Sequence, residues 1–547
     1  MTVPSVEPLP GRTQVLVAGG GPVGLATAVE LGQRGIRCLV VEPRAEVSHA
    51  RPRCKTVNVR TMEHLRRWGL AGRLRAAAPL PVSWSQDVVF CTSLAGRELS
   101  RFHGVLGLAA EGDRFPELGQ QAPQYLLEEL LRQAAGELPA CTLATGLRVV
   151  SLEQDDAGVK VRIGDRSGQS AIVTADYVVG CDGPRSTVRD QISVHYLGEH
   201  ALRPNFGMVF TAPELAGLVR HGPAVHYWIV NDVAPALMGP LDLAGTWWII
   251  AFGVDEEDGR RDPHRLIDGA AGAPVEATIL STDPWTARMQ LAGRLRAGRV
   301  FLAGDAAHLN PPFGGHGLNT GIGDAVDLGW KLAAVLQGWG GERLLDSYEA
   351  ERRPIQDRVI GEATRNMTVL TPELMTAGLD EDSQRGRDAR AAAHRRIQET
   401  KHAEFFALDL VLDITLDDSP VLAPAPGNTG AALRPGARLG HAWLAPGWSL
   451  FDELGPGLSL LLLSAADPAD LVQAARRRGA PLKVIDLTGT TLGARYGADA
   501  ALVRPDQYVA WCGSLHGLDA AALINRVCGG TRSTMTPRPL PADRPTD

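Results

Sequence analysis

The chain is poor in cysteine, and the spacing of its cysteines argues against both a disulfide framework and a thiol-redox site. Its seven cysteines are scattered over 547 residues, and no two form a C-x-x-C pair (38, 54, 91, 141, 181, 512 and 528). An odd, scattered set is typical of a protein in a reducing cytosol. We therefore expect small core residues at these positions, in a cytoplasmic protein.

A dominant charge and long apolar runs are missing as well. The 55 Lys and Arg residues stand against 62 Asp and Glu residues, which gives a formal net charge of −7, and like charges form no run. This balance argues against nucleic acid or an anionic membrane as the main partner. No apolar run reaches the ~18 residues of a membrane span, and the proline-rich segment 1–12 lacks a secretory pattern. The length predicts two to four domains.

A glycine-rich turn near the N-terminus has the spacing of a dinucleotide-binding fingerprint. A short apolar strand leads into it, a helix follows, and a second strand ends at Glu42. In this fingerprint Gly19 makes the tight turn, Gly21 lets the backbone approach a pyrophosphate, and Gly24 lets helix and strand pack closely. Glu42 is placed to hold a ribose hydroxyl. All these features fall in register within ~30 residues, which favours a bound dinucleotide over a glycine turn without a ligand.

Two further apolar strands end at an acidic residue. Residues 177–181 run into Asp182, and residues 300–304 run into Asp305. Ligands of open α/β sheets collect outside the carboxyl ends of parallel strands, so each carboxylate is placed to reach a ligand. For Asp182 the alternative is a helix cap. After Asp305 a proline turn opens a glycine-rich helix, whose N-terminus offers free N–H groups and a positive dipole end to an electron-rich ring.

Residues 193–285 differ in character, because they form consecutive strand-like runs rich in aromatic residues. These runs predict an antiparallel sheet, in which alternation puts His226 and Trp228 on one face and groups Trp248 with Ile250. Such a sheet can line a flat apolar pocket, although an ordinary core face is the alternative for any single residue. The candidate pocket residues are Met208, Phe210, Trp228, Met238, Trp248 and Phe313.

The remaining chain predicts how the domains are arranged. A proline- and glycine-containing stretch at 418–437 reads as a linker, and strand, helix, strand and strand patterns after it predict a small α/β domain. The expected divisions are a dinucleotide-binding domain in two parts (1–192, with sheet-domain strands near 82–112, and 286–370), a sheet domain (193–285), a helical segment with linker (371–437), the small domain (438–535) and a tail (536–547).

Three motifs in order resemble those of the group A flavoprotein aromatic hydroxylases, the para-hydroxybenzoate hydroxylase family. They are Gly19-x-Gly21-x-x-Gly24, Cys181-Asp182-Gly183 with Ser186 and Arg189, and Gly304-Asp305 followed by Pro311-Pro312 and Gly317-Leu318-Asn319. The resemblance covers residues 12 to about 370. It implies an α/β fold with a Rossmann-like FAD-binding domain of the glutathione-reductase type and an inserted antiparallel-sheet substrate domain. The C-terminal region resembles the thioredoxin-like domain of the larger phenol and polyketide hydroxylases, without its redox pair.

The resemblance also implies a cofactor and the residues that contact it. FAD is expected to be tightly but not covalently bound, with NADPH or NADH as a transient reductant. The implied FAD contacts are Gly19, Gly21, Gly24, Glu42, Arg53, Gln124, Asp182, Arg189, Asp305, Gly317, Leu318 and Asn319. Pro312 then lies by the reactive edge of the flavin, where Phe313 and His316 replace the threonine and lysine of the benzoate enzyme. His226 and His316 are the candidates to assist phenol deprotonation, with a purely structural role as the alternative.

The activity implied is monooxygenation of a phenolic or polycyclic aromatic compound by FAD, NAD(P)H and molecular oxygen, through a flavin C4a-hydroperoxide. The expected protein is a monomer or homodimer that binds a small aromatic substrate and no metal. Epoxidation or Baeyer–Villiger oxidation of a natural-product intermediate is the alternative within the fold. A halogenase is disfavoured because its lysine and Trp-x-Trp-x-Ile-Pro signature is absent. A FAD-free scaffold is the non-enzymatic alternative.

Overall fold

The first part of the fold is a largely parallel sheet, described in a computed structural model that covers residues 9–50, 55–110, 112–367, 369–424 and 433–530. Its strand order is β16-β17-β10-β1-β2-β7, and β8 and β9 extend β10 as an antiparallel hairpin. The central strand β1 pairs in parallel with β2 and with β10. The strands are β1 Arg12–Ala18, β2 Cys38–Glu42, β7 Cys141–Thr145, β8 Arg148–Asp155, β9 Gly158–Gly164, β10 Ser170–Gly180, β16 Arg296–Ala297 and β17 Val300–Leu302.

Helices cover this sheet because they carry apolar faces that join the strands in one core. Buried apolar side chains of β1, β2, β10 and β17 pack with apolar residues of α1 and α9, and these two helices contact each other. The helices of this part are α1 Pro22–Gly32, α2 Val59–Arg67, α3 Ala71–Ala77, α4 Gln124–Gly136, α5 Thr187–Gln191, α9 His316–Leu336 and α10 Glu342–Met367. The carboxyl ends of β1, β2, β10 and β17 therefore open toward the N-termini of α1 and α9.

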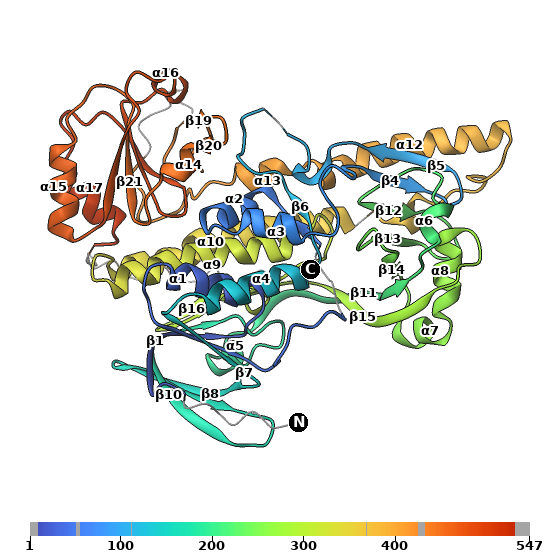
Figure 1. Ribbon diagram of the computed structural model, residues 1–547, viewed down its shortest axis with the longest axis horizontal. Coiled ribbons are helices and arrows are strands. Elements are labelled where there is room, and N and C mark those ends of the chain that lie inside the picture. Colours follow the sequence, from blue (N-terminus) through green and yellow to red (C-terminus); the bar gives the residue numbers. More distant parts are fainter. Residues whose placement is uncertain (1–8, 51–54, 111, 368, 425–432, 531–547) are drawn as a thin grey trace, which may run out of the picture.

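The second part is a sheet in the order β18-β15-β11-β14-β13-β12-β4-β5. Its pairs are antiparallel except for β4 and β12, which run parallel. One face packs on α8 and the other on α12, and Figure 1 shows the sheet beside the long helix α12. The elements are β4 Val88–Cys91, β5 Glu98–Phe102, β11 Tyr196–Thr211, β12 His226–Ile229, β13 Ala236–Pro240, β14 Thr246–Phe252, β15 Thr278–Ala292, β18 His308–Leu309, α6 Leu215–Leu218, α7 Glu256–Arg261, α8 Pro263–Ala271 and α12 Gln384–Phe405.

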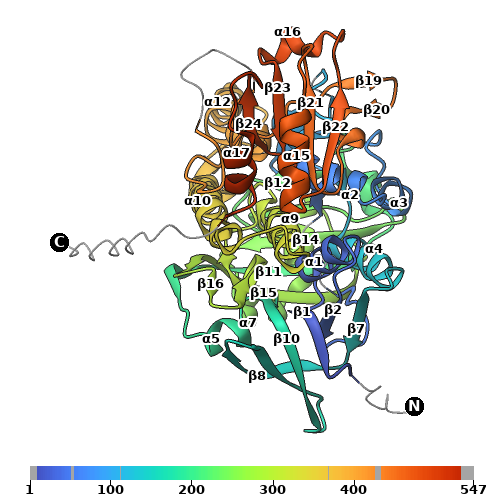
Figure 2. The ribbon, with the colours of Figure 1, turned by 90° about the vertical axis from the view of Figure 1, so that its left-hand side faces the viewer.

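The third part follows the 371–437 segment and forms its own sheet, in the order β22-β21-β23-β24. β21 pairs in parallel with β22 and antiparallel with β23, and Figure 2 shows α15 and α17 against this sheet. Cys512 and Cys528 are unpaired. The elements are β19 Trp443–Ala445, β20 Trp448–Ser449, α14 Leu450–Glu453, β21 Leu458–Leu462, α15 Ala469–Arg478, β22 Leu482–Asp486, α16 Leu492–Tyr496, β23 Ala500–Val503, β24 Val509–Gly513 and α17 Ala520–Val527.

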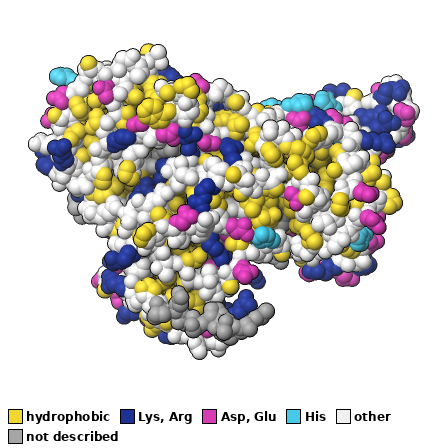
Figure 3. All heavy atoms as spheres, in the orientation of Figure 1, with side chains coloured by type: hydrophobic (Ala, Val, Ile, Leu, Met, Phe, Trp, Pro, Cys, Tyr) yellow, Lys and Arg dark blue, Asp and Glu magenta, His cyan; other side chains and the backbone are white. Residues whose placement is uncertain are grey.

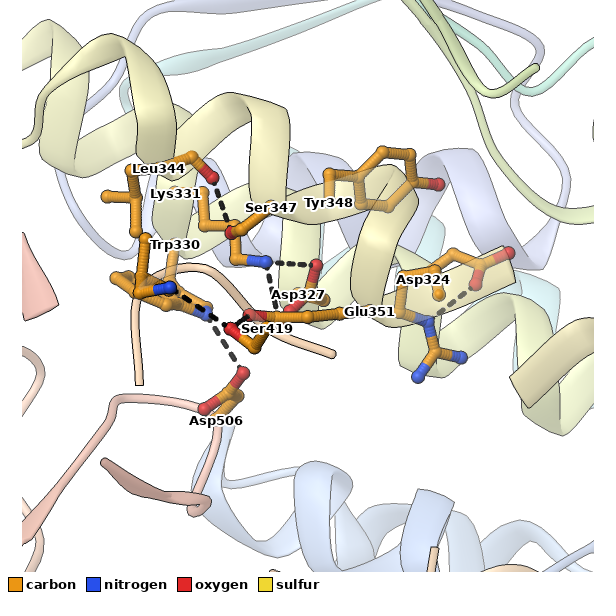
Figure 4. A network of polar contacts seen from close by, with 12 residues as sticks. Asp324, Asp327, Trp330, Lys331, Leu344, Ser347, Tyr348, Glu351, Ser419 and Asp506 are labelled. Carbon is orange, nitrogen blue, oxygen red and sulfur yellow. Dashed lines mark hydrogen bonds and ion pairs between the residues drawn. The ribbon is translucent and has the colours of Figure 1, made fainter. Parts of the chain in front are cut away.

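A buried ionic network joins this C-terminal part to α9 and α10. Arg504, in the β23–β24 turn, donates hydrogen bonds to Glu351 at 2.8 Å, to Asp327 at 3.0 Å and to Asp506 at 2.5 Å. Lys331 bridges Asp327 and Glu351 at 2.8 and 2.6 Å, and Figure 4 shows it between these two carboxylates. Although burial opposes ionisation, Arg504 and Lys331 hold the pKa of Glu351 well below its usual value. These contacts attach the C-terminal part to α9, and the N-terminus of α9 lies at the candidate site.

The face of the molecule drawn in Figure 3 carries charged side chains of both signs, interspersed with apolar ones. Within the described residues, no helix is long and apolar enough to cross a membrane. The same residues contain no group of at least three His, Cys, Asp or Glu side chains arranged to hold a metal ion.

Candidate active site

A cavity of about 1200 Å³ extends from the carboxyl ends of the first sheet to the inner face of the second. At one end it is lined by the β1–α1 turn, by the end of β2 and by residues 181–187. At the other end it is lined by the sheet strands β11 to β15 and by the end of α12. Asp305, residues 309–315, Gly317 and Leu318 also line it. One continuous cavity thus joins the predicted dinucleotide site to the predicted aromatic pocket.

The three glycines of the N-terminal turn have different surroundings. A Cβ added to Gly19, whose φ is +101°, would stand 2.3 Å from the carbonyl oxygen of Cys181. A Cβ on Gly24 would stand 1.9 Å from the carbonyl oxygen of Gly19, so α1 packs closely on the turn. A Cβ on Gly21 would meet no protein atom within 4 Å, because Gly21 borders the cavity. The turn therefore leaves a space beside the unsatisfied N–H groups of α1 that fits a pyrophosphate.

Glu42 ends β2 at the edge of the cavity and is 3% exposed. Its Oε2 accepts a hydrogen bond from the backbone N–H of Gly20 at 2.7 Å. Its Oε1 accepts from the Arg44 side chain at 2.7 Å, and Arg44 also reaches Glu128 at 2.8 Å. Oε1 also accepts from the backbone N–H of Arg44 at 3.0 Å. These bonds hold the carboxylate in place, and Oε2 keeps acceptor capacity for a ribose hydroxyl. Gln124, at the start of α4, lines the same cavity, whereas Arg53 lies outside the described residues.

Asp182 borders the cavity, but its carboxylate caps α5. It accepts hydrogen bonds from the Ser186 hydroxyl at 2.5 Å and from the Val188 N–H at 3.0 Å, which is the alternative role considered for it. Burial raises its pKa. Arg189 does not line the cavity; its guanidinium donates to the carbonyl of Ala306 at 3.3 Å and lies 3.9 Å from the Tyr196 ring centroid. Arg189 thus supports the backbone next to Asp305 rather than reaching the ligand space.

The loop after β17 brings Asp305 to the cavity and leads to the start of α9. Asp305 is exposed in the 3-10 turn Gly304–Ala306, and the Tyr196 hydroxyl donates to its carbonyl oxygen. Gly317 and Leu318 line the cavity in the first turn of α9. The N–H groups of a first helical turn have no intrahelical partner and carry the positive end of the helix dipole. This end therefore suits the electron-rich edge of a flavin.

Asn319 does not border the cavity, because its side chain is used to hold α9. It accepts hydrogen bonds from the Asn58 N–H at 3.0 Å and from the Thr61 hydroxyl at 2.7 Å. Its amide donates to the carbonyls of Thr56 at 2.9 Å and Gly315 at 2.7 Å. Asn319 therefore fixes the start of α9 against residues 56–61, and only the backbone of this turn is available to a ligand.

The aromatic end of the cavity contains part of the predicted pocket. Trp248 and Phe313 line it, as does Pro312, while Met208 borders it with its side chain in the core on the opposite face of the sheet. The structure does not bring the other three pocket candidates to it. Phe210 and Met238 pack toward α8 on that opposite face, and Trp228 stacks on Phe90 with ring centroids 5.3 Å apart. Ile250, Phe252 and Phe405 complete the apolar lining.

Comparison with known proteins agrees with this arrangement. Residues 12–363 match the family model described as FAD binding domain, and residues 432–529 match the aromatic-ring hydroxylase C-terminal model. A putative polyketide hydroxylase from Streptomyces halstedii is 34% identical over 91% of this chain and 93% of its own length. The chain belongs to the FAD-dependent aromatic-ring hydroxylases. The predicted family and its monooxygenase class are therefore confirmed.

Solved structures support the fold of this hydroxylase. The rebeccamycin biosynthetic enzyme RebC with reduced flavin superposes with a TM-score of 0.87 at 35% identity, covering 96% of this chain and all (100%) of the other. Aklavinone-11 hydroxylase, solved as a ternary complex with FAD and aklavinone, has a TM-score of 0.79 at 29% identity, covering 94% of this chain and 99% of the other. The FAD-binding domain, second sheet and C-terminal domain predicted for the chain are thus confirmed as its fold.

The two histidines considered for catalysis occupy different places in this hydroxylase. His226 lines the main cavity, where burial, with a smaller effect of Lys55, lowers its pKa to about 3. His316 points into a separate cavity of about 70 Å³ behind α9, and burial lowers its pKa to about 4. Both imidazoles are neutral at pH 7, and His226 is a weak base for a phenol. His226 can therefore contact a substrate in the main cavity, whereas His316 does not line that cavity.

Two buried charged residues of the cavity are not predicted by the sequence. Lys55 follows the basic segment 51–54, and a basic residue in such a segment is typical of a solvated surface. In the fold, however, the Lys55 side chain is buried. Glu404, at the end of α12, lines the cavity and accepts from Lys401 at 2.9 Å. Burial raises the pKa of Glu404. The segment 371–437 is expected to be helical in part, but its sequence carries no signal that the last turn of α12 lines the pocket.

Proposed function

We propose that this chain is an NAD(P)H-dependent monooxygenase that hydroxylates a phenolic or polycyclic aromatic ring. The observation that carries the proposal is the single cavity of about 1200 Å³ with a dinucleotide cradle at one end and aromatic walls at the other. In the balanced reaction, one atom of molecular oxygen becomes the new hydroxyl group. The other atom is released as water, whose formation consumes the hydride of the nicotinamide and one proton.

FAD would be held by the residues that border the cavity at its dinucleotide end. Gly21 and the N-terminus of α1 would face the pyrophosphate, Glu42 the ribose hydroxyls, and Asp305 the ribityl chain. When bound and reduced, FAD supplies the electrons that activate oxygen. The first turn of α9, with Gly317 and Leu318, would stabilise negative charge on the flavin ring.

The chain's own residues exclude water and orient the substrate at the aromatic end. Trp248, Phe252, Phe313 and Phe405 form apolar walls, which suit a flat ring system and keep water from the reacting atoms. The apolar walls at this end and the likeness to an enzyme solved with aklavinone support a polycyclic substrate. The unpaired cysteines of the described residues support a cytoplasmic location, and the strand order of the C-terminal domain supports its interpretation as thioredoxin-like.

The test is a screen of phenols and hydroxylated polycyclic compounds for faster flavin reduction by NADPH and by NADH. We expect one class of hydroxylated ring to accelerate reduction and to yield a product with one more hydroxyl group. The unhydroxylated form of each ring system is the matched control. A substrate that is converted only to an epoxide or a lactone would instead favour the alternative oxidation. A colourless protein that FAD does not reconstitute would exclude the enzyme.

A further inference from the structure

Lys55 places a buried ammonium group at the aromatic end of the cavity. The residue is 9% exposed and precedes the short strand β3, Thr56–Val57. Its Nζ donates to the carbonyl of Val225 at 2.5 Å and to the carbonyl of Pro240 at 3.0 Å. It lies 5.2 Å from the centroid of the Trp248 ring, and it lines the cavity. Because an ammonium has three N–H donors, one remains for a ligand.

This cation has no negatively charged partner among the described residues. The other two buried lysines do have one, since Lys331 pairs with Asp327 and Glu351 and Lys401 pairs with Glu404. Lys55 bonds only to neutral carbonyl groups. Burying an ammonium without a counter-charge is costly, and burial accordingly lowers the pKa of Lys55 to about 7. An anionic ligand would restore the balance of charge.

The titratable groups around Lys55 do not supply that charge. His226 on β12 is neutral at pH 7, since its pKa is lowered to about 3 by burial and then by Lys55 itself. Glu404 on α12 lines the cavity but is held by Lys401. Asp283 on β15 lines the cavity and has partners of its own. The missing anion is therefore expected to arrive with the substrate.

We propose that Lys55 binds the ionised hydroxyl group of the aromatic substrate, so that the preferred substrate is an acidic phenol held as its phenolate. This inference rests on the proposed aromatic hydroxylation and specifies the substrate for it. Because the pKa of Lys55 is about 7, part of the population is the neutral amine. This amine accepts the proton of the phenol O–H, which leaves an ammonium beside a phenolate, while the ammonium form binds a phenolate directly. The extra electron density of the phenolate then favours attack of the ring on an electrophilic oxygen.

The test uses the FAD-loaded protein and alizarin, a dihydroxyanthraquinone whose colour reports its ionisation. In the wild type we expect bound alizarin to ionise below its solution pKa and to bind about ten- to a hundredfold more tightly than unhydroxylated anthraquinone. Lys55→Met should abolish both effects, whereas Lys55→Arg, which keeps the charge, should retain most of them. Lys160→Met, at a lysine that is exposed on β9, is the matched control and should change nothing.

Several outcomes would overturn the proposal. One is a colour shift of bound alizarin in Lys55→Met that equals the shift in the wild type. Another is equal affinity of the wild type for alizarin and anthraquinone, and this measurement does not depend on the folding of a variant. Tighter binding of anthraquinone carboxylate than of alizarin would assign the anion to a carboxylate instead. If the wild type hydroxylates a phenol and Lys55→Met behaves identically, only the role of Lys55 is lost. If the wild type binds and hydroxylates no aromatic compound, the proposed function fails as well.

Discussion

Replacing Gly21 with valine is expected to yield a folded protein that lacks FAD. Gly21 has an ordinary extended backbone, with φ of −76° and ψ of −179°, so a side chain is tolerated there. Its added Cβ would meet no protein atom within 4 Å and would instead enter the cavity where the pyrophosphate belongs. The flavin absorbance of the purified variant, measured against total protein, should therefore be lost even after incubation with excess FAD.

Two controls separate this effect from misfolding. FAD stabilises only the folded state, so the variant must be compared with wild-type protein that has been stripped of flavin, and the two melting temperatures should agree. Gly24→Val should behave differently, because its side chain would collide with the carbonyl of Gly19 at 1.9 Å and disturb the packing of α1. A Gly21→Val protein with the flavin content of the wild type would show that the pyrophosphate lies elsewhere.

Replacing Arg504 with alanine is expected to cause the largest loss of stability among single changes away from the cavity. The guanidinium is fully buried and forms ion-pair contacts with Asp327, Glu351 and Asp506. Its removal leaves Asp506 without an ion pair and Asp327 and Glu351 with Lys331 alone. Breaking a buried pair in this way typically costs about 3–5 kcal/mol in free energy of unfolding. The loss in free energy of unfolding is measured from the shift in the midpoint of urea unfolding. Arg477→Ala, at an exposed arginine of α15, should cost less than about 0.5 kcal/mol.

The pH dependence gives a second reading of the same network. Because the folded-state pKa of Glu351 lies below the usual 4.5, its stabilising contribution is present above that value and is lost as the pH falls through the folded pKa. The difference in stability between wild type and Arg504→Ala should therefore be full at pH 7 and narrow as the solution is acidified. A difference that is constant with pH would mean that packing of the arginine, not its charge, carries the effect.

The sequence predicted those parts of the site that depend on local spacing. Gly19, Gly21 and Gly24 owe their roles to a turn between two adjacent elements, and Asp305 owes its position to the end of a strand. These relations are visible in a few consecutive residues. The parallel sheet, the second sheet and the small C-terminal domain follow from the same kind of local pattern.

What the sequence did not predict depends on distant partners. The Asn319 side chain forms hydrogen bonds with residues 56–61, which are far from it in the chain. The alternation of strands correctly separates two faces of the second sheet, but only the packing of α8 shows that Phe210 and Met238 belong to the face away from the cavity. Lys55 likewise becomes a cavity residue only because the carbonyls of Val225 and Pro240 meet it there.

The origin of the oxygen atom in the product decides whether the chain is an aromatic monooxygenase. An aromatic compound that accelerates flavin reduction should be converted by the FAD-loaded protein under isotopically labelled oxygen gas, in unlabelled water, with NAD(P)H. We expect one labelled oxygen atom in each new hydroxyl group, with one NAD(P)H oxidised per product. Unlabelled product, or oxidation of NAD(P)H that releases only hydrogen peroxide with every aromatic compound in the screen, would contradict it.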